Sequence, residues 1–308
     1  MNFNATLFGL VISVLIFSPV IASANESENP KVINWAGCGI TKKAFMKELA
    51  AEYSKRTGIV VTLSGGGATK GIRNAANGSI DIGGACRTTI STHEEERNAH
   101  QIPVAWDALV VTVNKDNPVS DISFQQLQKV YTGEISNWKQ LGGNDAPIEL
   151  YVRRGKLSGV GRTLRELVFH NFNQDFKATY VKKSSGPVEK GILKNINGIG
   201  ITGISSAKKR DLKLLSLNGH APTYEKIKKG EYVLYRPLYL VTKHNRVSKK
   251  VKDFIKFAVS RDGQEIIRKQ GTVPYSRAMA LVMKQLDQYD KAMADGLFHT
   301  QRVATSKE

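Results

Sequence analysis

Strand-like apolar runs alternate with helical patterns through the first third of the chain, and this alternation constrains the fold more than any other feature. Residues 31–35, 59–63 and 80–85 read as strands, and residues 41–56 and 68–76 between them have the apolar spacing of helices. Strand–helix–strand units of this length form parallel sheets with right-handed crossovers. The sequence therefore predicts an α/β fold.

The same kind of pattern continues to the end of the chain. The further expected elements are strands at 105–113, 148–152, 199–204 and 232–241, and helices after Ser158 and at 124–131, 247–260 and 277–293. A chain of 308 residues is long enough for two domains of ordinary size or for one large domain.

One strand-to-helix junction has the composition of a site for a small oxyanion. The run at 148–152 enters a loop with Arg154, Ser158 and Gly159, and an amphipathic helix follows. The first N–H groups of a helix lack partners within the helix, and the helix dipole favours negative charge there. Arginine offers a planar fork to two oxygens, and serine donates a hydrogen bond. The alternative is an ordinary loop with a serine cap and surface arginines.

The first two junctions of the chain also carry glycine, at residues 37–39 and 65–67, and ligands bind at such strand ends in open α/β sheets. The Gly-rich segment lacks the Gly-Lys-Ser/Thr ending of a P-loop. There is no G-x-S-x-G elbow, and the six histidines are dispersed without metal-ligand spacing. We therefore expect ligand binding without catalytic residues, metal or cofactor, and no enzyme.

The N-terminus indicates export. Residues 7–21 are largely apolar and are followed by Ala22-Ser23-Ala24, a small-x-small cleavage pattern. We predict a signal peptide over residues 1–24, the alternative being an uncleaved anchor. An exported protein rarely meets nucleic acid, so we expect no nucleic-acid partner.

The net charge is +18, from 45 basic and 27 acidic residues. The basic residues are scattered as doublets without interleaved aromatic residues. This pattern favours the interpretation that they are solvated surface residues. Attraction of an anionic ligand, or contact with an acidic membrane surface or partner, are the other roles open to this charge.

The two cysteines each follow a strand-like run. Cys38 comes after residues 32–36, and Cys86 comes after residues 80–85. In an exported protein an even pair suggests a disulfide, which would stabilise the fold by about 4 kcal/mol on the loop-entropy model. The alternative is a pair of buried thiols.

These pieces together resemble the periplasmic substrate-binding proteins of phosphate-type ABC transporters. The resemblance covers nearly the whole mature chain in the expected order. It is carried by residues 35–41, 62–72, 81–87, 104–118, 130–138 and 236–240, and by Arg154 with Ser158-Gly159. It implies two α/β lobes joined by two hinge-crossing strands, with lobe 1 at 30–106 plus 236–308 and lobe 2 at 107–235.

The resemblance also implies a set of ligand residues, at helix starts and at two arginines. In lobe 1 they are Ile40, Thr41, Gly65, Gly66 and Arg87, and in lobe 2 Arg154, Ser158, Gly159 and Val160. Some members of the family have aspartate at the position of Arg87, which accepts a hydrogen bond from protonated phosphate, and arginine cannot accept one. Val160 replaces a hydroxyl-bearing residue of the family pattern.

The function that the resemblance implies is capture of phosphate or a related oxyanion in the periplasm and its delivery to a membrane ABC permease, by a monomer. The alternative is a non-transport role of the same fold, as an anion sensor or as a protein that binds acidic partners through its basic surface.

Overall fold

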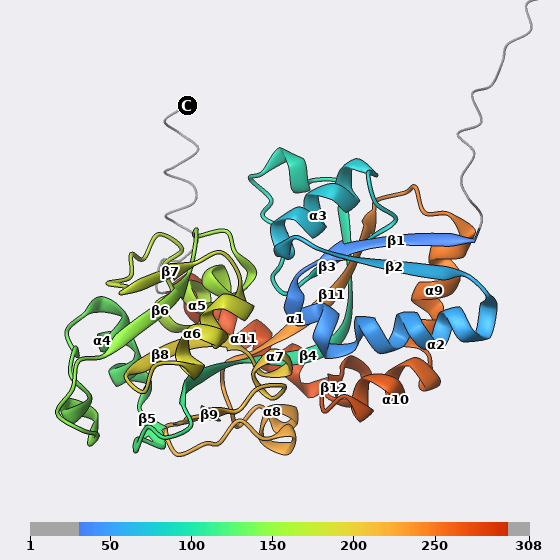
Figure 1. Cartoon of the computed structure of the whole chain (residues 1–308). Coiled ribbons are helices and arrows are strands. Elements are labelled where there is room, and N and C mark those ends of the chain that lie inside the picture. The colour runs from blue at the N-terminus through green and yellow to red at the C-terminus, as the bar shows by residue number, and fades with distance from the viewer. Residues whose placement is uncertain (1–30, 295–308) are drawn as a thin grey trace, which may run out of the picture. The chain divides into compact units, whose positions relative to one another are not determined.

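A mixed sheet runs through residues 31–294, the part of the chain that this computed structural model describes (Figure 1). The predicted signal peptide lies outside the described residues. Ten strands form the sheet, eight of them in the order β2-β1-β3-β11-β4-β8-β6-β7, while β9 and β12 pair with β4. The eight strands are β1 Val32–Gly37, β2 Val60–Gly65, β3 Ile82–Ala85, β4 Ala99–Asn114, β6 Glu149–Arg153, β7 Tyr180–Lys182, β8 Gly198–Gly203 and β11 Tyr235–Lys243.

Lobe 1 contains the parallel strands β2, β1 and β3. Its first helix begins at α1 (Gly39–Thr41) and continues without a break through a π-helical turn, η1 (Lys42–Met46), into α2 (Lys47–Thr57). Helix α3 (Gly67–Asn77) follows β2. Helices α9 (Lys249–Val259) and α10 (Arg261–Lys269) pack with α2.

Lobe 2 contains the parallel strands β7, β6 and β8. Its helices are α4 Phe124–Thr132, α5 Gly159–Phe169, α6 Ser185–Leu193, α7 Ile204–Ala207 and α8 Tyr224–Lys229. The C-terminal helix α11 (Ala280–Ala294) packs against α5 and α8. It lies in the range predicted for lobe 1 and yet contacts elements of lobe 2.

The remaining elements are short. They are β5 Asp121–Ile122, β9 Leu212–Leu214, β10 Ser216–Leu217, β12 Val273–Pro274 and the 3-10 turns η2 Glu94–Glu96, η3 Trp138–Leu141 and η4 Tyr275–Arg277.

Strands β4 and β11 connect the two lobes (Figure 1). They pair antiparallel from Ala99↔Lys243 to Ala108↔Tyr235. From Leu109 onward β4 pairs instead with β8 of lobe 2, so β4 belongs to both lobes. The predicted α/β architecture with two crossing strands is confirmed.

The helices α6, α8 and α10 were not expected from the sequence. Helix α6 begins after Ser184 in the segment Ser184-Ser185-Gly186-Pro187, which reads as a turn because glycine and proline are the usual turn residues. Among the described residues no helix is long and apolar enough to cross a membrane.

Helix α3 packs closely on the sheet of lobe 1, and glycine residues of the helix and of the sheet meet at the contact. A Cβ added at Gly83 would lie 2.2 Å from the carbonyl oxygen of Gly71 in α3. A Cβ at Gly71 would lie 2.8 Å from the carbonyl oxygen of Gly84. The neighbouring atoms are backbone, so a side chain cannot be accommodated by a change of rotamer.

We expect Gly83→Ala to destabilise the protein by about 1–3 kcal/mol, the usual cost of overpacking a tight interior. Gly39→Ala is the matched control, because a Cβ there meets no atom within 4 Å. Urea denaturation of the two variants and the parent measures the difference. Equal midpoints for both variants would show that α3 can move away from the sheet at little cost.

Candidate anion-binding site

A cavity of about 620 Å³ lies between the two lobes. Its walls are the segments that follow the strands of each lobe. From lobe 1 they include Cys38, Gly39, Ile40, Lys43, Gly65, Gly66, Gly67, Ala68 and Cys86. From lobe 2 they include Arg153, Gly159, Lys183, Ser184, Ser185, Gly186, Pro187, Lys190, Ser206 and Arg210.

Four helices begin at this cavity, two from each lobe. The residues at or next to the starts of α1, α3, α5 and α6 all line it. The N–H groups of a helix's first turn have no partner within the helix, and the dipole adds partial positive charge there. The arrangement therefore presents several backbone donors to one volume, which suits a ligand with negatively charged oxygens.

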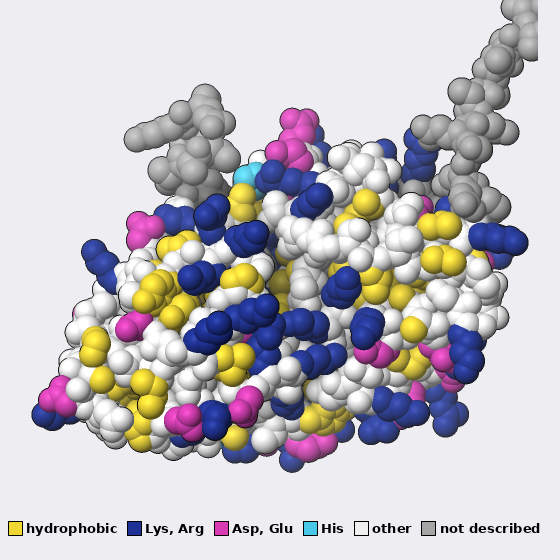
Figure 2. Space-filling view, viewed as in Figure 1, with side chains coloured by type: hydrophobic (Ala, Val, Ile, Leu, Met, Phe, Trp, Pro, Cys, Tyr) yellow, Lys and Arg dark blue, Asp and Glu magenta, His cyan; other side chains and the backbone are white. Residues whose placement is uncertain are grey.

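The side chains around the cavity are basic. Lys43, Arg153, Lys183, Lys190 and Arg210 line it, and no Asp or Glu does so among the described residues. Figure 2 shows Lys and Arg side chains gathered between the two lobes on the face that it displays. A cavity with this lining attracts anions and repels cations.

Glu189 is a fully buried carboxylate that pairs with two of these cations, Lys43 and Arg210. It accepts hydrogen bonds from the Thr202 hydroxyl at 2.7 Å and from Nε of Arg210, and lies 3.6 Å from Nζ of Lys43. Burial lowers the pKa of Lys43, an effect that Glu189 opposes. One carboxylate thus orients two of the cations, while Lys183 and Lys190 form no ion pair with any described residue.

Two adjacent arginines at the end of β6 have opposite environments. Arg153 lines the cavity, its Nη1 donates to the Ser185 hydroxyl at 3.1 Å, and its buried Nε has no partner among the described residues. Burial lowers the pKa of Arg153. Arg154, which the sequence predicted as a ligand residue, is exposed and does not line the cavity. The structure therefore presents the neighbouring arginine instead.

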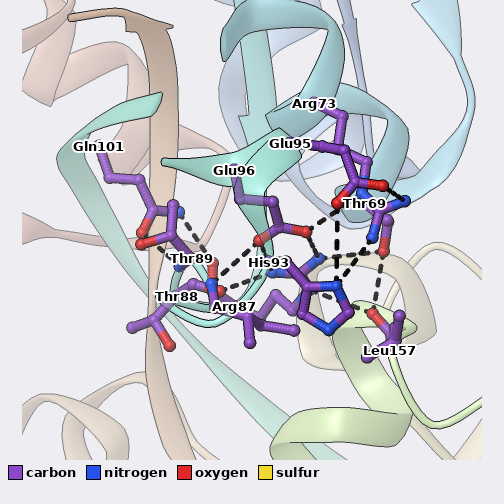
Figure 3. Close-up of polar contacts among 11 residues, drawn as sticks. Thr69, Arg73, Arg87, Thr88, Thr89, His93, Glu95, Glu96, Gln101 and Leu157 are labelled. Atoms are coloured by element: carbon purple, nitrogen blue, oxygen red, sulfur yellow. Dashed lines mark hydrogen bonds and ion pairs between the residues drawn. The ribbon is translucent and has the colours of Figure 1, made fainter. Parts of the chain in front are cut away.

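Arg87 is buried in an ion pair rather than aimed into the cavity (Figure 3). Its Nη2 and Nη1 donate to the two carboxylate oxygens of Glu96 at 2.7 and 2.8 Å. Its Nε donates to the Leu157 carbonyl at 3.1 Å. Burial works to raise the pKa of Glu96, but the hydrogen bonds and charge of Arg87 outweigh it, and the pKa of Glu96 is lowered.

The guanidinium of Arg87 has further partners in the Thr88 carbonyl at 2.7 Å and the Thr69 hydroxyl at 3.1 Å. All of its donors are therefore occupied by protein acceptors. Arg87 thus connects lobe 1 to the loop of lobe 2 that contains Leu157. The role of Glu96 is not evident from the sequence, because three consecutive glutamates at 94–96 resemble a solvated surface run.

The other predicted ligand residues divide into two groups. Ile40, Gly65, Gly66 and Gly159 line the cavity. Thr41, Ser158 and Val160 do not. The hydroxyl of Thr41 is directed to the Ala85 carbonyl, and the hydroxyl of Ser158 accepts from the Gly161 N–H as the N-cap of α5. Four of the predicted residues thus line the cavity, whereas the hydroxyls of Thr41 and Ser158 are hydrogen-bonded to the protein backbone.

Cys38 and Cys86 are free thiols in the structure, so the predicted disulfide is not present. They were correctly placed at the same sheet edge, since β1 and β3 are paired neighbours and both cysteines line the cavity. The Cys38 sulfur accepts the Thr41 N–H at 3.2 Å and thereby caps α1. A hydrogen bond from Cys38, with the nearby cations Arg236 and Arg153, lowers the pKa of Cys86 to about 6 against the opposing effect of burial.

None of the cavity residues that α6 and its preceding loop supply was predicted from the sequence. The basic doublet Lys182-Lys183 was interpreted as surface charge, and Ser184 was not recognised as an N-cap. A serine three residues before a proline, followed by Val188 and Ile192 at helical spacing, is the signal that could have found this helix.

The structure has two α/β lobes joined by two strands, and an anion-attracting cavity lies between the lobes. This is the architecture of a two-lobed ligand-binding protein. The chain belongs to the PBP superfamily, whose domain model matches residues 24–262. Among the described residues no group of three or more His, Cys, Asp or Glu side chains could hold a metal ion.

Curated relatives and solved structures agree with this membership. The phosphate-binding protein PstS of Borreliella burgdorferi is 28% identical over 272 residues, which cover 85% of this chain and 96% of the relative. A Clostridium perfringens protein, described as a candidate phosphate ABC transporter substrate-binding protein and solved with bound phosphate, is 27% identical with a TM-score of 0.73, covering 79% of this chain and 99% of that one. An ABC-type phosphate transport receptor of Vibrio cholerae is 27% identical with a TM-score of 0.62 over the same shares.

The Arg87–Glu96 pair generates a stability prediction. Glu96→Gln leaves the buried Arg87 charge without its counter-ion, and we expect a loss of about 3–5 kcal/mol in the free energy of unfolding, measured by urea denaturation. Glu94→Gln is the control, since the Glu94 side chain is 85% exposed beside Arg97. A change below about 0.5 kcal/mol for Glu96→Gln, the range of ordinary surface substitutions, would contradict the structural role of the pair.

The thiol pair generates a pH prediction. Because the pKa of Cys86 is lowered and that of Cys38 is raised, chiefly by burial, a small thiol reagent entering the cavity should modify Cys86 first. The rate of modification should be half-maximal near pH 6, and Cys86→Ser should abolish this phase. Peptide mass spectrometry after timed alkylation measures both rates. A midpoint near pH 9 would show that neither the hydrogen bond from Cys38 nor the neighbouring cations stabilise the Cys86 thiolate.

Proposed function

We propose that this protein is an extracytoplasmic substrate-binding protein that captures inorganic phosphate between its lobes and delivers it to an ABC permease. The observation that carries the proposal is the cavity at which four helices begin, lined by five basic side chains and by no carboxylate of the described residues. The relatives and solved structures named for phosphate binding support the same ligand.

Capture would combine backbone and side-chain donors. The N–H groups at the starts of α1 and α3 would hold phosphate oxygens from lobe 1, and Arg153 with the start of α6 would hold them from lobe 2. Charge-assisted hydrogen bonds of this kind are roughly twice as strong as neutral ones. Since no carboxylate of the described residues faces the cavity, there is no carboxylate acceptor for a protonated phosphate oxygen, and we expect sulfate to compete.

Opening and closing would occur where the crossing strands change partners. Strand β4 passes from β11 to β8 between Ala108 and Leu109, and the Leu109 N–H donates to the Leu234 carbonyl just before β11 begins. This supports lobe boundaries near 107 and 235. Hinge closure around a ligand is the usual motion of periplasmic binding proteins.

The remaining parts of the proposal concern the cell. Cleavage of residues 1–24 would release the mature chain into the periplasm, where the protein would act as a monomer and dock to its permease. It would have no catalytic activity, because its part in transport is to bind and hand over the ligand.

The adjacent arginines test the proposal with a built-in control. Arg153→Ala removes a guanidinium that lines the cavity, and we expect phosphate affinity to fall about 10–100-fold, since hydrogen bonds to charged groups contribute about 1.5–3 kcal/mol. Arg154→Ala changes the charge equally but touches an exposed side chain, so affinity should stay within about twofold. Calorimetric titration of unfolded and refolded, ligand-free protein measures both.

The reverse result, with loss of binding in Arg154→Ala and retention in Arg153→Ala, would place the ligand outside this cavity. Absence of phosphate binding by the parent protein at low salt would overturn the proposed ligand.

A further inference from the structure

The cavity is large although the lobes already touch on both sides of it. On one side the Leu157 carbonyl of lobe 2 accepts hydrogen bonds from Arg87 and from the Thr69 hydroxyl, at 3.1 and 3.0 Å. On the other side Nζ of Lys43 donates to the Ser206 hydroxyl at 2.6 Å. Because these bonds span the lobes, the cavity of about 620 Å³, which is open to solvent, lies between lobes that are in contact.

This volume is much greater than orthophosphate needs. Cavities of about 300–1,000 Å³ are the size that proteins use for ligands of drug size, whereas orthophosphate has five non-hydrogen atoms. A single phosphate group would therefore reach only part of the wall at once. The lining implies a ligand with more than one anionic group.

The start of α5 is in close contact with lobe 1 at one corner of the cavity. A Cβ added at Gly159 would lie 2.4 Å from the Cys86 sulfur and 3.2 Å from the Ala68 Cβ, so protein atoms fill this corner. Arg87, at the same corner, has its donors occupied by protein. Away from this corner, the donors that line the cavity lie in two places, one on each lobe.

The first place is the start of α1 and α3 in lobe 1, where Gly39, Ile40, Gly66 and Gly67 line the cavity. The second is the start of α6 in lobe 2, where Ser184 makes no side-chain capping bond. Arg153, Lys183 and Lys190 surround the second place, and none of the three has an ion pair with a carboxylate of the described residues.

The cations that line the cavity, and the lack of aromatic side chains among its described lining residues, indicate which kind of larger ligand would fit. Three cations without carboxylate partners exceed what orthophosphate neutralises, since it carries between one and two negative charges near neutral pH. No aromatic ring of the described residues lines the cavity, so nothing there would stack on a nucleobase. Dense negative charge on two linked groups fits these walls best.

We propose that the cavity binds a condensed phosphate, with diphosphate as its smallest member. One phosphoryl group lies at the starts of α1 and α3, and the other lies at the start of α6 among Arg153, Lys183 and Lys190. This inference rests on the proposed function, because it names the ligand class of the same cavity.

Calorimetric titration with diphosphate and with orthophosphate, each with a chelator and at fixed ionic strength, tests the inference. We expect diphosphate to bind the parent protein at least tenfold more tightly than orthophosphate. In the double variant Lys183→Gln/Lys190→Gln, diphosphate affinity should fall at least tenfold and orthophosphate affinity by a smaller factor, so the preference should shrink.

Lys182→Gln/Lys194→Gln is the matched control, since it removes the same charge from neighbouring positions that do not line the cavity. It should keep the preference for diphosphate. Orthophosphate binding equal to or tighter than that of diphosphate would overturn the inference and leave the proposed function standing. Binding of neither anion would overturn both.

Discussion

The unpaired N–H groups at helix starts are the feature on which the whole site depends. Strands β1, β2, β6 and β7 each lead into one of the helices α1, α3, α5 and α6. Within each lobe these strands run parallel, so their carboxyl ends, and the helix starts that follow, lie at one edge of the sheet. Two such edges face one another across the cavity. The glycine packing of α3 on the sheet serves the same end, since it holds a helix start close to the strand ends.

The charged side chains near the cavity do two different jobs. Arg87 is a buried cation with a buried counter-ion, and one of its hydrogen bonds, from Nε to the Leu157 carbonyl, joins the lobes. Arg153, Lys183 and Lys190 have no carboxylate partner within residues 31–294 and leave the cavity strongly positive. Burying an unpaired charge is costly, so the free cations lie where water or a ligand reaches them, and the paired one lies where neither does. An arginine near a cavity is therefore a ligand candidate only if its donors are unoccupied.

The two thiols at this edge of the sheet have different roles, one in capping a helix and one as an acidic thiol. Cys38 caps the first helix through its sulfur, and the pKa of Cys86 is lowered beside it by that thiol and by Arg236 and Arg153. The same positive field that favours an anionic ligand thus also favours a thiolate. Since Cys86 contacts the start of α5, the lobes meet at the point where this reactive sulfur lies.

The sequence by itself determined the alternation of strands and helices in the first third of the chain and the glycine-bearing helix starts at residues 39–40 and 65–66, because these follow from local periodicity and backbone chemistry. It did not determine which of two adjacent arginines lines the cavity, since successive strand residues point to opposite faces and a shift of one residue in register reverses the answer. Only the tertiary structure shows that Arg87 pairs with Glu96 and that α6 begins at the cavity. Both depend on contacts between segments that are distant in sequence, and local sequence patterns do not predict such contacts.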